Sequence, residues 1–187
     1  MKTIIFATTN NHKLEEVNQI LKHCKAIALS QKYDVEENGT TYAENALIKA
    51  KEAYKRFKQP VFADDSGIEI KALNHWPGLK SARVLNTEYK LKEIYDLCKM
   101  NNYNELSFHC AIAYIDANGI DHIFTAVIEG KLASRFCEYE DTFGYDPIFV
   151  PNGSEITYAQ MSKQQKNHCS HRAIALAQFE EWLKNNE

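Results

Sequence analysis

Four common catalytic motifs are missing from this sequence of 187 residues. It contains no Walker A phosphate loop and no dinucleotide-binding glycine fingerprint. It also contains neither the Gly-x-Ser-x-Gly elbow of α/β-hydrolases nor the His-Glu-x-x-His helix of zinc proteases. These absences remove several common enzyme classes from consideration.

Paired cysteines are missing as well. The five cysteines are odd in number, widely scattered and include no Cys-x-x-Cys pair. This usage predicts reduced thiols rather than a disulfide framework or a zinc site. The residues concerned are Cys24, Cys98, Cys110, Cys137 and Cys169.

A surplus of basic residues and long apolar runs are also missing. The formal net charge of -3 argues against general nucleic-acid binding, so any nucleotide partner should be small. The apolar run at 3–7 is too short for a signal peptide, and no later stretch could span a bilayer. We therefore expect a cytoplasmic protein without a nucleic-acid or membrane partner.

The composition is that of an ordinary globular protein, with 44% hydrophobic and 25% charged residues, so disorder is not expected. The length fits one domain with a sizeable core and leaves room for two lobes. There is no internal repeat, low-complexity segment or linker. A single domain over 1–187 is therefore predicted.

Apolar periodicity predicts an α/β protein. The clearest β-hairpin joins strands at 106–115 and 120–127 through the turn dipeptide Asn118-Gly119. The strongest helix covers 43–57, where apolar residues recur at i, i+3, i+4 and i+7 over four turns. Further strands are predicted at 3–7, 26–29 and 148–150, and further helices at 14–21, 91–100 and 175–183.

Two neighbouring aspartates follow a short buried strand at 61–63. The segment 64–67, Asp-Asp-Ser-Gly, is predicted to turn before a strand pattern resumes at 68–70. Turn chemistry alone would explain these residue types, because Asp and Ser bond their own backbone and Gly tolerates positive φ. Carboxylates at a strand end would equally suit a divalent cation that bridges to phosphate oxygens. Both interpretations stay open on this stretch alone.

Candidate anion-binding side chains stand at three other places. The loop 8–13 enters a helix, where exposed N–H groups and Lys13 could receive a phosphate, although plain capping is the alternative. Lys49 lies on a polar helix stripe that is either solvated or faces the aspartates. The acid-free segment 156–179 carries a basic strip, which suits a polyphosphate or forms a solvated face.

One aromatic loop completes the candidates. Phe143 and Tyr145 flank a glycine, and Asp146 precedes a proline. The rings could stack on a nucleobase, or they could form an aromatic pair at the edge of the core.

Seven short motifs follow one another along the whole chain. They are Thr8-Thr9-Asn10-Asn11-His12-Lys13, Glu36-Glu37-Asn38-Gly39, the segment 44–50, Ala63-Asp64-Asp65-Ser66-Gly67, Pro77-Gly78 with Ser81-Ala82-Arg83, Phe143-Gly144-Tyr145-Asp146-Pro147, and Lys166 with Ser170-His171-Arg172. In this order they resemble the motifs of the inosine triphosphate pyrophosphatase family, also called Ham1-like. Its members hydrolyse non-standard purine nucleoside triphosphates (ITP, dITP, XTP) to the monophosphate and pyrophosphate.

The resemblance implies an elongated two-lobed α/β fold, with a long central mixed β-sheet flanked by helices and a nucleotide cleft between the lobes. It also implies a Mg2+ requirement and a homodimer. Metal binding is implied for Asp65 and Glu36, and Asp65 is the implied proton acceptor. Substrate binding is implied for Thr8, Thr9, Asn10, Asn11, His12, Lys13, Lys49, Ser66, Phe143, Gly144, Tyr145, Asp146, Lys166, His171 and Arg172.

The resemblance also suggests how damaged purines would be distinguished. Inosine and xanthosine carry a 6-keto acceptor where adenosine carries an amino donor. Donors on Arg172 and His171 would therefore favour the keto bases and reject adenine.

Three positions depart from the family pattern. Thr9 replaces a common glycine, Gln160 replaces an acidic residue, and Ala173 replaces a glycine. Only Thr9 bears on the chemistry, since a side chain there could narrow the approach of the phosphates.

Hydrolysis at the α-phosphorus needs charge neutralisation by Lys13, Lys49 and Mg2+, together with a carboxylate that orients or deprotonates water. If both aspartates kept strand geometry, only one could meet the ion directly, and Glu36 would be the second ligand.

Two alternative functions remain open. An aspartyl-phosphate phosphatase would release orthophosphate, and a silent nucleotide-binding regulator would leave the triphosphate intact.

Overall fold

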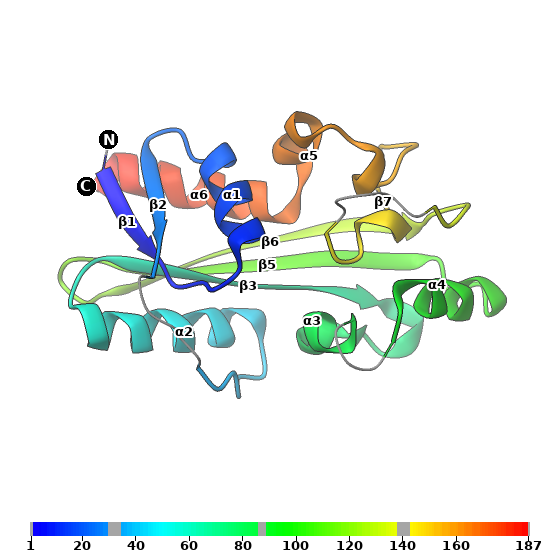
Figure 1. Cartoon of the computed structure of the whole chain (residues 1–187), viewed down its shortest axis with the longest axis horizontal. Helices are drawn as coiled ribbons and strands as arrows, with labels where there is room; N and C mark the ends of the chain where they lie inside the picture. The colour runs from blue at the N-terminus through cyan, green and yellow to red at the C-terminus, as the bar shows by residue number, and fades with distance from the viewer. Residues whose placement is uncertain (1, 30–34, 86–88, 138–142, 187) are drawn as a thin grey trace. The chain divides into compact units, whose positions relative to one another are not determined.

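The computed structural model describes residues 2–29, 35–85, 89–137 and 143–186 (Figure 1). Tyr33 and Asp34, the first residues of a segment at 33–39 that the sequence predicts to be an acidic loop, lie outside these residues. The helices are α1 (Asn11–Ile20), α2 (Tyr42–Phe57), α3 (Ser81–Arg83), α4 (Leu91–Met100), α5 (Lys163–Cys169) and α6 (His171–Asn186). The strands are β1 (Lys2–Phe6), β2 (Cys24–Ala28), β3 (Val61–Ile70), β4 (Trp76–Pro77), β5 (Glu105–Ile115), β6 (Asp121–Leu132) and β7 (Phe149–Pro151).

The central sheet is mixed, as expected. Its strand order is β2-β1-β3-β5-β6-β7, and β4 pairs with β3 outside this path. Strands β2 and β3 both run parallel to β1, whereas β4 and β7 are antiparallel to their neighbours. The α/β fold class and the predicted hairpin between β5 and β6 are therefore confirmed.

The chain divides into two compact units. Unit 1 comprises residues 1–65, 110–126 and 169–187, and unit 2 comprises 66–109 and 127–168. Strands β3, β5 and β6 contribute residues to both units. Each unit has a core of its own.

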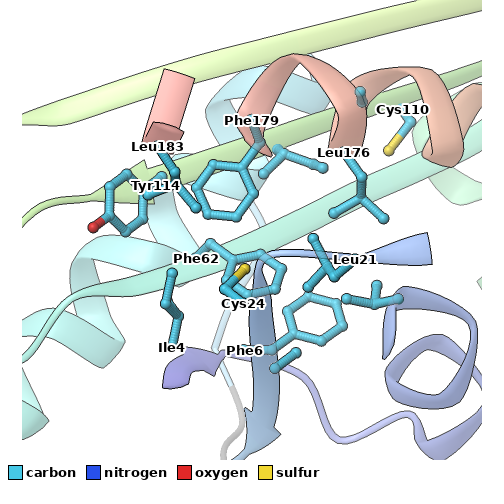
Figure 2. Packing of buried hydrophobic residues seen from close by; sticks show 14 of the residues in the cluster. Ile4, Phe6, Leu21, Cys24, Phe62, Cys110, Tyr114, Leu176, Phe179 and Leu183 are labelled. Carbon is cyan, nitrogen blue, oxygen red and sulfur yellow. The ribbon is translucent and has the colours of Figure 1, made fainter. Parts of the chain in front are cut away.

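The core of unit 1 has two layers, because successive side chains of its strands point to opposite faces. On one face, Phe62 stacks on Phe6 with ring centroids 4.6 Å apart and packs against Phe179 of α6 (Figure 2). On the other face, small residues such as Ala63 pack against Ala46 and the other alanines of α2. Helices α1 and α6 thus cover one face of these strands and α2 covers the other.

The core of unit 2 is built from aromatic rings. Phe108 of β5 lies 4.8 Å from Phe149 and 5.8 Å from Tyr158, measured between ring centroids. Strand β7 passes so close to β6 that a Cβ on Gly130 would lie 2.4 Å from the carbonyl oxygen of Val150. Gly130 is therefore required for this strand pairing.

Candidate active site

Strand β3 runs without interruption through the two aspartates. The predicted turn at 64–67 is therefore wrong, since Asp64 and Asp65 lie in the middle of a ten-residue strand. Their exposed fractions are 4% and 7%, respectively. Buried carboxylates are tolerated inside a strand only where partners compensate for lost hydration, and both residues have such partners. The alternation of strand side chains sends them to opposite faces of the sheet.

Asp64 faces α1 and α6, and two cations surround it. Lys13 Nζ lies 3.0 Å from Asp64 Oδ1, and Arg172 donates through Nε and Nη2 to Asp64 Oδ2 at 3.2 Å each. Burial alone would raise the pKa of Asp64, but Lys13 and Arg172 together hold it well below its usual range. Asp64 is therefore ionised and fully neutralised by its neighbours.

Arg172 is enclosed by carboxylates. It is 1% exposed, and its Nη1 donates to Glu16 Oε2 of α1 at 2.6 Å. Burial lowers the pKa of Arg172, but Glu16 and Asp64 outweigh it and hold that pKa above its ordinary value. The guanidinium therefore ties α6 to α1 and β3 within unit 1.

Asp65 faces α2 and is less well neutralised. Lys49 Nζ lies 3.4 Å from Asp65 Oδ1, and Asn45 donates through Nδ2 to Asp65 Oδ2 at 3.3 Å. Burial raises the pKa of Asp65; Lys49 opposes this shift, while the negative charge of Glu37 adds to it. The two adjacent aspartates thus have pKa values shifted in opposite directions, because Asp64 has two close cations and Asp65 has one beside a further carboxylate.

The acidic loop reaches this face through Glu37. Glu36 and Glu37 are both exposed, and Glu37 Oε1 lies 2.9 Å from Lys49 Nζ. Burial lowers the pKa of Lys49, but the carboxylates of Asp65, Asp64 and Glu37 raise it overall. The structure thus brings Glu37 to Lys49 beside Asp65, whereas Glu36 was the residue predicted to serve the metal with Asp65.

The loop before α1 is organised by capping. Asn10 is the N-cap, and its side chain accepts from the backbone N–H of Lys13 at 3.2 Å. Thr8 Oγ1 accepts from the backbone N–H of Asn10 at 3.1 Å. The neighbouring residues Thr9, Asn11 and His12 are exposed. Asn10 thus caps α1, which leaves phosphate binding at this loop open, and Lys13 is the residue of this loop that the structure brings to Asp64.

Helix α6 begins at His171, which is buried. Ser170 precedes it and accepts from the backbone N–H of Ala173 at 3.1 Å. This bond places Arg172 in the first turn of α6, where its side chain meets Asp64 and Glu16.

The remaining predicted residues belong to unit 2. Lys166 Nζ lies 2.5 Å from Asp146 Oδ2 and 5.8 Å from the ring centre of Tyr158. Tyr145 is buried and donates its hydroxyl to the carbonyl of Ser81 at 2.9 Å, so its ring belongs to the core. Phe143 is only half-buried and Gly144 is exposed. Ser66, in β3, is also half-buried.

All five cysteines are free thiols, as predicted. Among the described helices, none is long and apolar enough to cross a membrane.

Comparison with known proteins decides the family. The sequence model of the Ham1 family matches residues 4–182. The chain is 38% identical to a dITP/XTP pyrophosphatase of Porphyromonas gingivalis and 39% identical to one of Borrelia duttonii, with 98% of each chain covered. This chain belongs to the Ham1 family.

Solved Ham1 structures have the same fold. The Staphylococcus aureus Ham1 protein superimposes with a TM-score of 0.86 and 33% identity, covering 100% of both chains. A HAM1 protein from Coxiella burnetii gives a TM-score of 0.85 with 34% identity, covering 99% of this chain and 100% of that one.

Two features of this Ham1 site were missed by sequence reasoning. Glu16 gave no signal, because a glutamate on a short helix looks solvated until the partner helix is known. Asn45 was not singled out on the polar stripe that it shares with Lys49, yet it is 3% exposed and bonded to Asp65. Its spacing of four residues from Lys49 puts the two side chains on one helix face, which is the signal that could have found it.

Proposed function

We propose that this Ham1-family chain hydrolyses dITP, ITP and XTP to the monophosphate and pyrophosphate, and so prevents their incorporation into nucleic acids. The names of its curated relatives support the substrate class. The observation that carries the reaction is the contrast between the two aspartates of β3. Asp64 is neutralised by two cations, whereas Asp65 keeps a raised pKa beside Lys49 and Glu37.

In this proposal Asp65 orients and deprotonates the water that attacks the α-phosphorus. A carboxylate with a raised pKa is a better proton acceptor near neutral pH than an ordinary one. Lys13 and Lys49 hold the phosphate oxygens, and Thr8 and Asn10 shape the backbone before α1. An ammonium group carries three N–H donors, so Lys13 can bond Asp64 and a phosphate oxygen together.

The residues around Asp65 fit a divalent cation. Burial and the nearby Glu37 both disfavour the charge of Asp65, a cost that a cation would relieve. Among the described residues, no group of three or more His, Cys, Asp or Glu side chains could hold a metal alone. Mg2+ typically binds one or two carboxylates together with substrate phosphates. We therefore assign Asp65 and Glu37 to Mg2+, which would neutralise phosphate charge when bound.

The base is assigned to the loop at 143–146 and to Lys166. We propose that Phe143 stacks on the purine, while Asp146 and Lys166 form hydrogen bonds with its edge. Ser66 would contact the substrate next to Asp65. A cytoplasmic homodimer is proposed from the family resemblance alone.

A product assay tests the proposed function. The chain is incubated with Mg2+ and, separately, dITP, ITP, XTP, ATP and GTP, and pyrophosphate and orthophosphate are scored independently. We expect pyrophosphate from the first three substrates and little from ATP. Orthophosphate as the main product would indicate an aspartyl-phosphate phosphatase. Binding without turnover would indicate a silent nucleotide-binding regulator.

Lys13 and Lys49 should contribute to the binding of the triphosphate but not to the binding of the monophosphate. We expect Lys13→Ala and Lys49→Ala each to weaken binding of a non-hydrolysable ITP analogue about 10- to 100-fold, as for a lost charge-assisted hydrogen bond. Binding of inosine monophosphate should change less than about 3-fold. Calorimetry measures both affinities. Lys55→Ala, an exposed lysine on α2, is the control. Equal losses for both ligands would mean that the lysines do not bind the phosphate tail.

A further inference from the structure

Asn45 of α2 connects two parts of unit 1, which are the loop that carries Glu37 and the strand β3 that carries Asp65. Its Oδ1 accepts from the backbone N–H of Gly39 at 2.8 Å, and its Nδ2 donates to Asp65 Oδ2 at 3.3 Å. The two contacts fix the orientation of the amide, because a backbone N–H needs an acceptor and an ionised carboxylate needs a donor. Asparagine supplies both groups on one short side chain.

The contacts of Asn45 close a ring. Lys49 lies one turn further along the same face of α2 and bonds both Asp65 and Glu37. Glu37 in turn lies two residues before Gly39, which is bonded to Asn45. The ring therefore joins Asp65 on β3, two side chains on α2, and the loop that carries Glu37.

The loop approaches Asn45 as closely as a backbone can. A Cβ built on Gly39 would lie 2.7 Å from Asn45 Oδ1 and 2.8 Å from Glu44 Cβ, distances at which something must move. The start of α2 is held independently, since Thr41 accepts from the backbone N–H of Glu44 and Glu44 accepts from Thr40. The helix would therefore keep its start without Asn45, while the loop would lose its link to Asp65 through the amide and keep only the one through Glu37 and Lys49.

We propose that Asn45 is a positioning residue that sets where Glu37 stands relative to Asp65, and so shapes the divalent-cation site. This inference rests on the proposed function, in which both carboxylates serve one cation. Asn45 itself touches neither the cation nor the nucleotide in this proposal. Its amide holds the orientation of Asp65 on one side and the loop on the other.

The test is a Mn2+ titration followed by electron paramagnetic resonance, in the presence of an ITP analogue that cannot be cleaved between its α and β phosphates. Asn45→Ala should weaken Mn2+ binding about 10- to 100-fold, the usual effect of losing a partner behind metal ligands. Affinity for the analogue at saturating Mn2+ should change less than about 3-fold, since the phosphate-binding lysines stay in place.

Ala50→Gly is the matched control. Ala50 is buried on the same helix but lies outside the ring, so its replacement loosens α2 without removing these contacts. If Ala50→Gly weakened Mn2+ binding as much as Asn45→Ala, the role of Asn45 would be only to stabilise the helix. Unchanged Mn2+ affinity in a folded Asn45→Ala protein would also overturn the inference.

Gly39→Ala disturbs the contact between Gly39 and Asn45 from the side of the loop. It replaces Asn45→Ala as the test variant if Asn45→Ala does not fold. The added methyl must displace the Asn45 amide or the loop, so the same loss of Mn2+ affinity is expected. Retained affinity in a folded Gly39→Ala protein would contradict the proposal. The outcome is separate from that of the proposed function, because wild-type release of pyrophosphate from dITP is measured without any variant.

Discussion

Replacing Asp65 with Asn is expected to lower kcat by about 100-fold or more while the protein stays folded, since a general base typically contributes 10²- to 10⁴-fold. The substitution keeps the shape of the side chain but removes the negative charge that orients water and binds the cation. Steady-state kinetics with dITP and Mg2+ measure the loss. Turnover near that of wild type in a folded Asp65→Asn protein would refute the assignment of Asp65.

Thermal unfolding supplies a second readout for the same variant. Burial raises the pKa of Asp65 in the folded protein, so the folded state holds this proton more tightly than the unfolded state. Ionisation of Asp65 therefore lowers the free energy of unfolding at pH values above the folded pKa. Asp65→Asn removes this cost, and its Tm at neutral pH should equal or exceed that of wild type. A clearly lower Tm would show that Asp65 is needed for folding.

The acidic limb of the activity profile should follow from the same shift. Only ionised Asp65 can accept a proton, so activity should fall as pH decreases through the raised pKa. In the pH profile of kcat/KM, which reports the enzyme before substrate and cation bind, the limb should therefore lie above about 3.9, the value of an unperturbed aspartate.

Replacing Arg172 with Met is expected to lower the free energy of unfolding by about 3 to 5 kcal/mol, the usual result of removing one partner of a buried ion pair. The variant leaves Asp64 with Lys13 alone and deprives Glu16 of its buried partner. Chemical denaturation measures the change. Arg56→Met, an exposed arginine on α2, should change stability by no more than about 0.5 kcal/mol.

Substitution of Arg172 also tests which residue recognises the purine base. The sequence resemblance assigns a purine contact to Arg172, whereas its guanidinium in unit 1 is engaged by Asp64 and Glu16. We propose that Arg172 acts by holding Asp64, and with it Lys13. Arg172→Lys keeps the charge, and the ratio of kcat/KM for ITP and ATP should then stay near that of wild type. A fall in this ratio would support direct contact of Arg172 with the 6-keto oxygen.

Hydrophobic periodicity was sufficient for most of the fold. The helix at 43–57 and the hairpin around Asn118-Gly119 were predicted correctly, because each is specified by local pattern and turn chemistry. The segment at 64–67 was not, since its residue types are those of a turn. Strand β3 can continue through Asp64 and Asp65 because distant residues compensate their charges. These residues are Lys13, Lys49, Arg172 and Asn45.

Which glutamate of the loop lies at Lys49 could not be predicted from sequence for a related reason. Glu36 and Glu37 are neighbours of the same type, and the choice depends on how Gly39 meets Asn45. A shift of one residue reverses which glutamate faces Lys49. Only the tertiary contact of the loop with α2 decides this.

Hydrolysis in water enriched with oxygen-18 tests the central claim most directly. If water attacks the α-phosphorus of dITP, the label enters the deoxyinosine monophosphate and the pyrophosphate stays unlabelled. We predict this distribution, analysed by mass spectrometry after a single turnover. Label in the pyrophosphate or in released orthophosphate would contradict the account, because attack would then occur at the β- or γ-phosphorus.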